Sequence, residues 1–526
     1  MRDDGRMRRR QLPRIGLVLG GGGSRGAFQV GAVACLYSEF GLRPDTIAGT
    51  SVGALAATVL AHARTRDEQR EAVDRLAAIW RSLRTESDMY VPRRWLADVP
   101  ARTRVDLAAL AAGRGSAGAV MGLVRSVASL RRAASDFRAD GSSAYSLEPL
   151  EAIVSREVDP DRVREGVATL RISTVSVSSG ELRWVGEDGM LYETDAATPA
   201  RGDHVSLVDA LLASVAFVPA FPARSMAGGD YVDGGFRSVL PVRAALATGA
   251  QVILAVACAE TGKGAMRPIT GTNLLRTTLR AYGATMAEVG RRDVADLDRI
   301  RGILLEPRVW VHDFLAVDPG RIGISIDQGW LTAAELLDAV GGTDGLVASL
   351  DPGRPPTSDP DALAATTALT DAIVELRTQA WHHEELLATG APPAERPAAL
   401  EAVRIRKWLL RHAVAARAAR SGPVPTGMAA WATDLEAHRG ALVVPDPWSG
   451  MSSVHGGHVP AVDPDAFVPP TFRLRGLPSG REWVAVDGIR RPATEGATPP
   501  ARPNEHAVRA GAIAIGDTAA DLVPVA

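Results

Sequence analysis

The 526-residue chain is poor in cysteine, lysine and aromatic residues, and its charges nearly cancel. Its two cysteines, Cys35 and Cys258, are too few for a disulfide scaffold. Both lie in apolar runs, so we expect two buried thiols, and a reducing compartment is allowed. The only lysines are Lys263 and Lys407, so arginine carries nearly all of the positive charge. The 59 basic and 61 acidic residues leave a formal net charge of −2, which provides no basic field to hold nucleic acid.

Long hydrophobic runs are also missing. No stretch of about 18 apolar residues is free of charges and glycine clusters, so we expect no membrane-spanning helix. Met1–Arg10 carries five arginines ahead of an apolar stretch that starts at Ile15, which imitates a secretory signal. That stretch contains a glycine cluster and Arg25 and has no clean small-residue cleavage site. We therefore expect a cytoplasmic protein rather than a secreted one.

What the chain does contain is typical of a globular protein, at 46% apolar and 23% charged residues. Its N-terminal part predicts a strand, a loop, a helix, a second strand, a turn and a second helix. These are expected at Ile15–Leu19, Gly20–Gly26, Ala27–Phe40, Thr46–Ala48, Gly49–Gly53 and up to about Ala63. Further strands are expected at Leu170–Val177, Leu182–Val185 and Gln251–Ala257, and a helix at Leu207–Ala216. This alternation indicates an α/β sheet.

A glycine-rich string joins the first strand to the first helix. It reads Gly21, Gly22, Gly23, Ser24, Arg25 and Gly26. Such a run lets the backbone approach a ligand closely, and its N–H groups, with the following helix N-terminus, form an anion site. The anion could be a dinucleotide pyrophosphate, since the string fits G-x-G-x-x-G, or the oxyanion formed in acyl transfer. A tight turn without a ligand is the third interpretation.

Two further strings carry residue types used in catalysis. The first is the G-x-S-x-G string Gly49, Thr50, Ser51, Val52 and Gly53. It lies between a strand and a helix, the context of a nucleophile elbow, where a strained turn exposes the serine hydroxyl. The helix dipole that begins there favours developing negative charge. The second string is Asp233, Gly234 and Gly235, which by itself predicts only a turn.

Together and in this order, the three strings resemble the patatin-like phospholipase family. The resemblance extends from about Leu12 to about Ala339. Shorter matches support it at Pro44–Ala48, Ser146–Leu150, Ala213–Ala216, Phe221–Pro222 and Leu240–Val242. The resemblance implies a three-layer α/β/α fold with a mainly parallel central sheet. It also implies a lipid acyl hydrolase that needs no cofactor and acts on phospholipids or related acyl esters.

The resemblance also assigns roles to residues. Ser51 would attack the ester carbonyl, and Asp233 would accept its proton and pass it to the leaving alcohol. Water activated by Asp233 would then release the acid from the acyl-enzyme. The N–H groups of Gly22 and Gly23 would hold the oxyanion, while Arg25 would either support that loop or bind a lipid phosphate. A carboxylate with a pKa near 3.9 is a poor base, so burial would have to raise the pKa of Asp233.

On this basis we divide the chain into four parts. A basic tail at 1–11 precedes a catalytic domain at 12–345, which contains a helical insertion or lid near 65–145. A helical extension is expected at 346–420 and a partly disordered Pro/Gly/Ala-rich region at 421–526. A small hairpin is expected near Phe472–Val486. Met121–Arg138 predicts an amphipathic helix with a basic face. It would either contact anionic lipid at a membrane surface or act as a lid, or it would pack on the core with its charges in solvent.

Two other functions stay open. A nucleotide-binding oxidoreductase would use the glycine-rich loop, with Asp45 as the acidic residue about 20 positions further on. A catalytically silent scaffold or effector would recruit partners through its C-terminal half. A Ser–His mechanism has weaker support, because His204 and His312 lie in no matching motif. No metal site is expected, because no partnering carboxylate or cysteine set accompanies His382 and His383, or His455 and His458.

Overall fold

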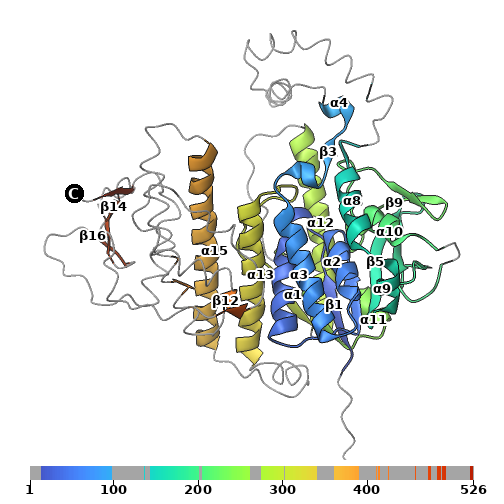
Figure 1. Ribbon diagram of the computed structural model, residues 1–526, viewed down its shortest axis with the longest axis horizontal. Helices are drawn as coiled ribbons and strands as arrows, with labels where there is room; N and C mark the ends of the chain where they lie inside the picture. The colour runs from blue at the N-terminus through green and yellow to red at the C-terminus, as the bar shows by residue number, and fades with distance from the viewer. Residues whose placement is uncertain are drawn as a thin grey trace, which may run out of the picture.

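The computed structural model shown in Figure 1 describes six main segments, at residues 13–97, 143–200, 204–260, 274–300, 302–340 and 360–389. It also describes residue 136, four residues from 410 to 417, and six short strands beyond residue 420. The expected basic tail at 1–11 lies outside the described residues. So does the expected amphipathic helix Met121–Arg138, apart from Asp136.

A five-stranded parallel sheet forms the centre of the fold. In spatial order its strands are β11 (Ile303–Leu305), β10 (Val252–Val256), β1 (Ile15–Leu19), β2 (Thr46–Gly49) and β5 (Thr169–Ser176). Strands β1, β2 and β10 are buried almost throughout. Their near-continuous apolar sequences are those expected of parallel strands that helices cover on both faces.

Four further strands join the sheet in antiparallel fashion. They are β6 (Leu182–Gly186), β7 (Leu191–Tyr192), β8 (Arg224–Met226) and β9 (Gly229–Asp233). Strands β6 and β7 extend the sheet beyond β5, whereas β9, paired with β8, adds to the other edge of β5. The predicted fold class, a mainly parallel sheet between helices, is confirmed, and the antiparallel flank is an addition to it. The sequence did not predict β7, β8, β9 or β11. These strands are two to five residues long, too short for a clear alternation of apolar and polar side chains.

Strands β2 and β9 share one edge of β5. Strand β2 runs parallel to β5 and ends with Gly49 beside Ile172. Strand β9 runs antiparallel to β5 and ends with Asp233 beside Thr174. The C-terminal ends of the two strands therefore point toward each other, with only Ser173 of β5 between the two ladders. This topology brings together two chain segments that are far apart in the sequence.

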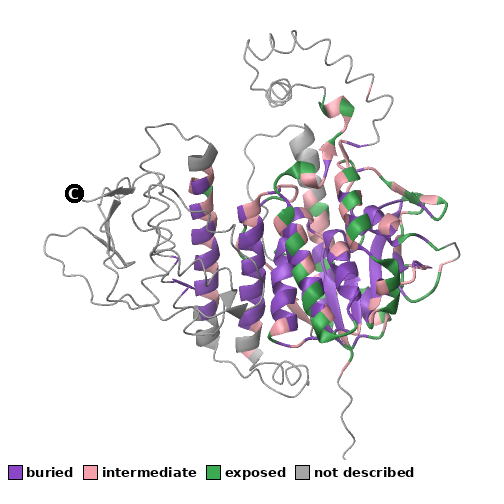
Figure 2. Cartoon of the chain, in the orientation of Figure 1, coloured by how far each residue is buried: buried purple, intermediate pink, exposed green. Residues whose placement is uncertain are grey.

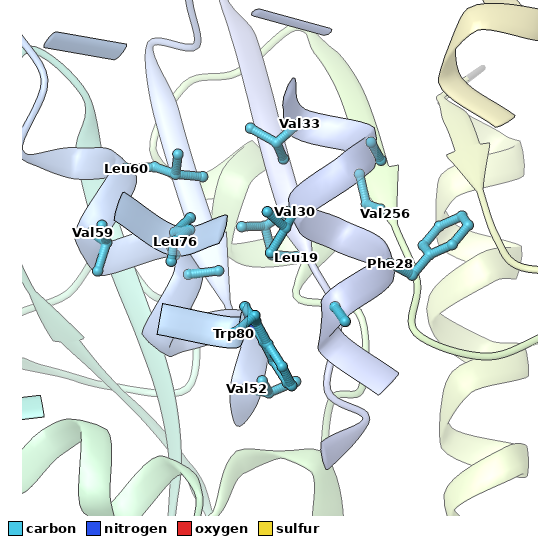
Figure 3. Close-up of a cluster of buried hydrophobic side chains, with 14 of the residues drawn as sticks. Leu19, Phe28, Val30, Val33, Val52, Val59, Leu60, Leu76, Trp80 and Val256 are labelled. Atoms are coloured by element: carbon cyan, nitrogen blue, oxygen red, sulfur yellow. The ribbon is translucent and has the colours of Figure 1, made fainter. Parts of the chain in front are cut away.

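Helices cover both faces of the sheet, and Figure 2 shows the sheet itself buried between them. The helices of the described residues are α1 (Ala27–Ser38), α2 (Val52–Ala61), α3 (Arg66–Ser82), α4 (Arg94–Ala97), α8 (Glu148–Glu157), α9 (Pro160–Glu165), α10 (Leu207–Ser214), α11 (Val242–Ala247), α12 (Leu274–Arg299), α13 (Pro319–Val340) and α15 (Pro360–Thr389), with single 3₁₀ turns η1 (Gly23–Gly26), η2 (Glu86–Asp88) and η3 (Gly234–Phe236). Leu17 and Leu19 of β1 pack in one cluster with α1, α2 and α3, part of which is shown in Figure 3, whereas Val18 packs in another with α11. This alternation defines the three layers.

Helix α13 packs directly against α1. A Cβ at Gly31 would lie 1.7 Å from the Ile326 carbonyl oxygen, and one at Gly329 would lie 1.9 Å from the Phe28 carbonyl oxygen. The two glycines therefore allow the helix backbones to touch, which no side chain at either position would permit. Because α13 covers its outer side, residues Ala27–Tyr37 of α1 are all buried.

Helix α15 adds a further layer on α13 (Figure 1) and lies in the predicted helical extension. The buried Arg377 of α15 donates to Asp327 of α13. Arg308 pairs with both Glu335 and Asp371, at 3.0 and 2.9 Å. The proposed domain boundaries at 345 and 420 stay predictions, because the residues there lie outside those described. No helix in the described part of the chain is long and apolar enough to cross a bilayer.

Short strands outside the main sheet pair antiparallel. Strands β14 (Phe472–Leu474) and β15 (Trp483–Val486) form such a pair, which confirms the hairpin predicted near Phe472–Val486. The remaining short strands are β3 (Val91–Pro92), β4 (Tyr145–Ser146), β12 (Val424–Pro425), β13 (Gly456–Gly457), β16 (Ile489–Pro492) and β17 (Leu522–Pro524).

Candidate active site

Ser51 lies at a sharp turn between β2 and α2. Its backbone has φ 54° and ψ −127°, a conformation that residues with a side chain rarely adopt and that functional turns retain. Two glycines make the turn possible. A Cβ at Gly53 would lie 2.2 Å from the Leu19 carbonyl oxygen, and one at Gly49 would lie 2.4 Å from the Gly53 carbonyl oxygen. The G-x-S-x-G string thus has the strained strand–turn–helix geometry of a nucleophile elbow.

Buried hydroxyl groups hold the backbone around Ser51. The Ser51 N–H donates to Ser214 Oγ at 2.9 Å. The Thr50 hydroxyl donates to the Ser238 carbonyl oxygen at 3.0 Å and accepts from the Ser173 hydroxyl at 2.8 Å. An unpaired polar group would be costly at this depth, so these bonds fix the position of the elbow.

Asp233, the last residue of β9, lies close enough to Ser51 for their side chains to interact. Its own N–H donates to the Ala216 carbonyl oxygen at 3.1 Å, and its Oδ1 accepts from the Gly235 N–H at 2.7 Å. The residue is 2% exposed. Burial raises the pKa of Asp233 to about 7, although the Gly235 N–H and the nearby Ser51 hydroxyl, which favour the carboxylate, act in the opposite direction. A carboxyl group that ionises near neutral pH is a much better base than an ordinary aspartate.

The two glycines after Asp233 are required by close contacts. A Cβ at Gly234 would lie 2.0 Å from Ser173 Oγ, so only glycine lets η3 pack against β5. A Cβ at Gly235 would lie 2.8 Å from Met286 Cε and 3.0 Å from Asp233 Oδ1. The Asp-Gly-Gly string is therefore a turn in which the lack of side chains lets the backbone pack against Ser173 and lets the Gly235 N–H reach the Asp233 carboxylate.

The loop Gly21–Gly26 lies next to Ser51, since a Cβ at Gly21 would be 3.4 Å from Ser51 Cβ. Gly21 donates its N–H to the Val239 carbonyl oxygen at 3.0 Å, and Ser24 donates its N–H to the Phe314 carbonyl oxygen at 2.8 Å. The N–H groups of Gly22 and Gly23, between these two anchors, have no acceptor among the described residues. They are therefore free to bind an anion.

Crowding around the loop excludes side chains at its centre. A Cβ at Gly22 would lie 2.1 Å from Cys258 Cβ. Gly23 has φ +58°, and a Cβ there would lie 2.3 Å from the Phe314 carbonyl oxygen. Cys258 itself is buried, and burial raises the pKa of its thiol to about 12. Both Cys35 and Cys258 are buried free thiols, as predicted.

Arg25 lies against the same loop. Its Nε donates to the Gly22 carbonyl oxygen at 3.3 Å. The guanidinium group lies 5.2 Å from the ring centroid of Trp310 and 5.7 Å from that of Phe314. Of the two roles considered for Arg25, support of the loop is the one that these contacts favour.

A pocket with about 460 Å³ of empty space, its open mouth included, reaches Ser51. Its lining is apolar apart from a few groups around Ser51. The lining residues are Gly23, Ser24, Ser51, Val52, Leu55, Met89, Tyr90, Leu147, Leu150, Val215, Phe217, Phe221, Phe314 and Leu315. The Tyr90 hydroxyl donates to the Leu315 carbonyl oxygen at 2.6 Å, so the one phenol in the wall is already paired. Such a pocket can desolvate an alkyl chain beside the serine hydroxyl.

The other candidate residues lie away from this arrangement. Asp45 Oδ2 accepts from the Ile15 N–H at 2.7 Å, so this carboxylate lies at the opposite end of β1 from the glycine-rich loop. His204 is exposed, with its Nδ1 3.1 Å from the Asp188 carbonyl oxygen. His312 is buried, and burial lowers its pKa to about 4. Within the described ranges, no group of three His, Cys, Asp or Glu side chains is placed to hold a metal ion.

The model of the patatin-like phospholipase family matches residues 17–246. This segment belongs to the patatin-like phospholipase family. The patatin segment contains the glycine-rich loop, the elbow and the Asp-Gly-Gly turn, so the resemblance drawn from these strings is confirmed. Strands β10 and β11 and helices α12, α13 and α15 follow the matched residues in the chain.

Two solved structures are similar to this chain at low scores. One is VipD from Legionella pneumophila, at 12% identity and a TM-score of 0.30, with 84% of this chain and 90% of that chain covered. The other is full-length SpcU in complex with full-length ExoU from the type III secretion system of Pseudomonas aeruginosa, at 16% identity and a TM-score of 0.18, with 82% and 91% covered. No curated protein matches the chain.

Several residues that contact the elbow or the glycine-rich loop were not predicted from the sequence. Ser214 lies in the string Ala213–Ala216, which signalled a match without indicating that its hydroxyl holds the Ser51 N–H. Ser173 and Ser238 belong to no recognised string. Phe314 lies beyond the matched residues, and it acts here through its backbone carbonyl group, which leaves no side-chain signal.

Proposed function

We propose that this protein is a serine acyl hydrolase that cleaves fatty-acyl ester bonds of phospholipids or related lipids. The observation that carries the proposal is the proximity of the Ser51 and Asp233 side chains at an apolar pocket, beside two amide groups that have no acceptor among the described residues. Membership of residues 17–246 in the patatin-like phospholipase family supports the lipid substrate. A cytoplasmic location with peripheral contact at a membrane surface is part of the same proposal.

In the first half of the reaction, Ser51 Oγ attacks the ester carbonyl carbon while Asp233 accepts the hydroxyl proton. The tetrahedral intermediate collapses, the bond to the leaving oxygen breaks, and Asp233 returns the proton to the departing alcohol. The acyl group stays on Ser51. The raised pKa of Asp233 suits both proton transfers, because a group with a pKa near the working pH can accept and donate.

The negative charge of each tetrahedral intermediate falls on the former carbonyl oxygen. The N–H groups of Gly22 and Gly23 are the donors that we assign to it, because their neighbours Gly21 and Ser24 already donate elsewhere. One such donor contributes about 10²–10³ in rate in serine hydrolases. Both groups are backbone amides, so their effect requires the loop to be held in place.

In the second half, water replaces the alcohol. Asp233, again a carboxylate, accepts a proton from the water as its oxygen attacks the acyl carbon. Collapse of this intermediate breaks the bond to Ser51 Oγ, which regains the proton, and the fatty acid leaves. The apolar wall excludes other water molecules from the acyl chain.

Of the two competing functions, nucleotide binding is not supported by the position of Asp45, its candidate acidic residue. The Asp45 carboxylate caps the start of β1, whereas the glycine-rich loop follows its end. A silent scaffold or effector has the same fold but an unreactive Ser51, so only chemistry separates it from the hydrolase.

The test is release of fatty acid from mixed phospholipid vesicles by the full-length protein. Ser51→Ala and Asp233→Asn are each expected to abolish release while leaving the fold intact by circular dichroism. Ser178→Ala and Asp230→Asn are matched controls, since both residues are exposed and Asp230 lies on β9 with Asp233. Activity near wild type in Ser51→Ala or Asp233→Asn contradicts the proposal.

A further inference from the structure

Helix α12 carries a carboxylate that contacts the catalytic loops from outside the matched patatin segment. Asp293 Oδ2 accepts two backbone bonds, from the Val239 N–H at 2.7 Å and the Leu240 N–H at 2.8 Å. The Asp293 residue is 9% exposed. The two N–H groups belong to the segment Ser238–Leu240, which follows the Asp-Gly-Gly turn in the chain.

The same short segment holds both halves of the candidate site through its carbonyl groups. The Ser238 carbonyl oxygen accepts from the hydroxyl of Thr50, the residue before the nucleophile. The Val239 carbonyl oxygen accepts a hydrogen bond from the N–H of Gly21, the residue that precedes Gly22 and Gly23. Displacing this segment therefore moves the elbow and the oxyanion loop relative to each other.

Helix α12 also contacts the turn that carries the base. Met286 Cε lies 2.8 Å from the position of a Cβ at Gly235, so the Met286 side chain abuts that glycine. Burial raises the pKa of Asp293 to about 7, against the effect of the two amide bonds. An aspartate in such a place costs stability, and the structure gives it no ion pair among the described residues. Its bonds to the segment, from the two amides and from the Ser238 hydroxyl at 3.5 Å, are the contacts that account for it.

We infer that Asp293 is a positioning residue for the proposed reaction. It fixes the segment Ser238–Leu240. This segment holds the Ser51 elbow and the amides of Gly22 and Gly23 in their positions relative to each other. The inference rests on the proposed hydrolase function. Asp293 acts as a hydrogen-bond acceptor and touches neither the pocket nor the reacting atoms, so its loss should lower kcat and leave KM nearly unchanged.

The variants that test this are Asp293→Ala, Asp293→Asn and the control Asp296→Ala. Asp296 lies one turn further along α12, with its side chain 13% exposed, and pairs with Arg243 and Arg299 instead of a catalytic loop. Asparagine keeps a side-chain oxygen that can accept both amide bonds. With a soluble fatty-acyl ester, we expect kcat to fall about 10–100-fold in Asp293→Ala, with KM within about threefold of wild type. We expect Asp293→Asn to recover most of kcat and Asp296→Ala to keep it.

The outcomes separate this inference from the proposed function. A wild type that hydrolyses the ester no faster than Ser51→Ala rejects the function and the inference together. An active wild type with unchanged kcat in Asp293→Ala rejects the inference alone, and so does an equal loss in Asp296→Ala. If Asp293→Ala does not fold, Asp293→Glu takes its place, because the longer side chain displaces the acceptor. Wild-type kcat in that variant overturns the inference.

Discussion

The pH dependence of ester hydrolysis should report the raised pKa of Asp233. Asp233 must be a carboxylate to accept the serine proton, so kcat/KM should rise with pH as this group ionises. With a pKa of about 7, about 1% of the protein carries the carboxylate at pH 5 and about 90% at pH 8. The rate should therefore be about 100-fold lower at pH 5. An aspartate at the ordinary value of 3.8 would give nearly equal rates at the two pH values.

The assay measures initial rates on a neutral, soluble fatty-acyl ester between pH 4.5 and 8.5, with the fatty acid quantified directly. Asp293 is a second buried carboxyl with a pKa of about 7, so the profile is repeated in Asp293→Asn. The acid limb should stay near pH 7 in that variant, because Asp233 is unchanged. An acid limb near pH 4 in wild type refutes the assignment of Asp233 as a desolvated base.

The same burial predicts a stability signature with a definite sign. Native Asp233 holds its proton up to about pH 7, whereas the unfolded chain loses it near pH 4. The native state therefore binds more protons between these values, and this group makes stability fall as pH rises through that window. Replacement by asparagine removes that fall. Asp233→Asn should match wild type at pH 4 and exceed its unfolding free energy by up to about 4 kcal/mol at pH 8, as measured by urea denaturation.

Three further changes test other contacts. Ser214→Ala leaves the buried Ser51 N–H without its acceptor, so it should cost about 1–3 kcal/mol by urea denaturation and lower kcat; unchanged values contradict the role of Ser214. Gly329→Ala places a Cβ 1.9 Å from the Phe28 carbonyl oxygen, so it should lower the melting temperature by many degrees, whereas Gly229→Ala, with its nearest contact at 3.6 Å, should not. Leu55→Trp reduces the pocket, so kcat/KM should fall about tenfold or more for long-chain esters and little for acetyl esters; an equal fall contradicts the acyl pocket.

The central strands and the serine turn were predictable from the sequence because each has a local cause. Ile15–Leu19 and Gln251–Ala257 are apolar runs that predict buried strands, and both contain strands of the parallel sheet. The elbow needs glycine on both sides of Ser51, and the close contacts of Gly49 and Gly53 give the physical reason for the string. The pKa of Asp233 was expected to need burial, and burial is its largest cause.

What the sequence could not supply was long-range pairing. The short strand β9 has no distinct hydrophobic pattern, so its place on the same edge of β5 as β2 could not be read from composition or spacing. The Phe314 carbonyl oxygen and the Asp293 carboxylate both accept from backbone N–H groups of the loops, across large separations in the chain. Neither residue lies in a recognisable string, and both follow the matched patatin segment.

The reactivity of Ser51 toward a fluorophosphonate probe tests the central claim most directly. Intact and peptide mass spectrometry should find a single adduct on Ser51 in the wild-type protein and none in Ser51→Ala. The rate of labelling should fall by about 10² or more in Asp233→Asn, because the base is lost while the hydroxyl remains. No adduct on Ser51, or labelling of Asp233→Asn as fast as wild type, would contradict a serine activated by Asp233.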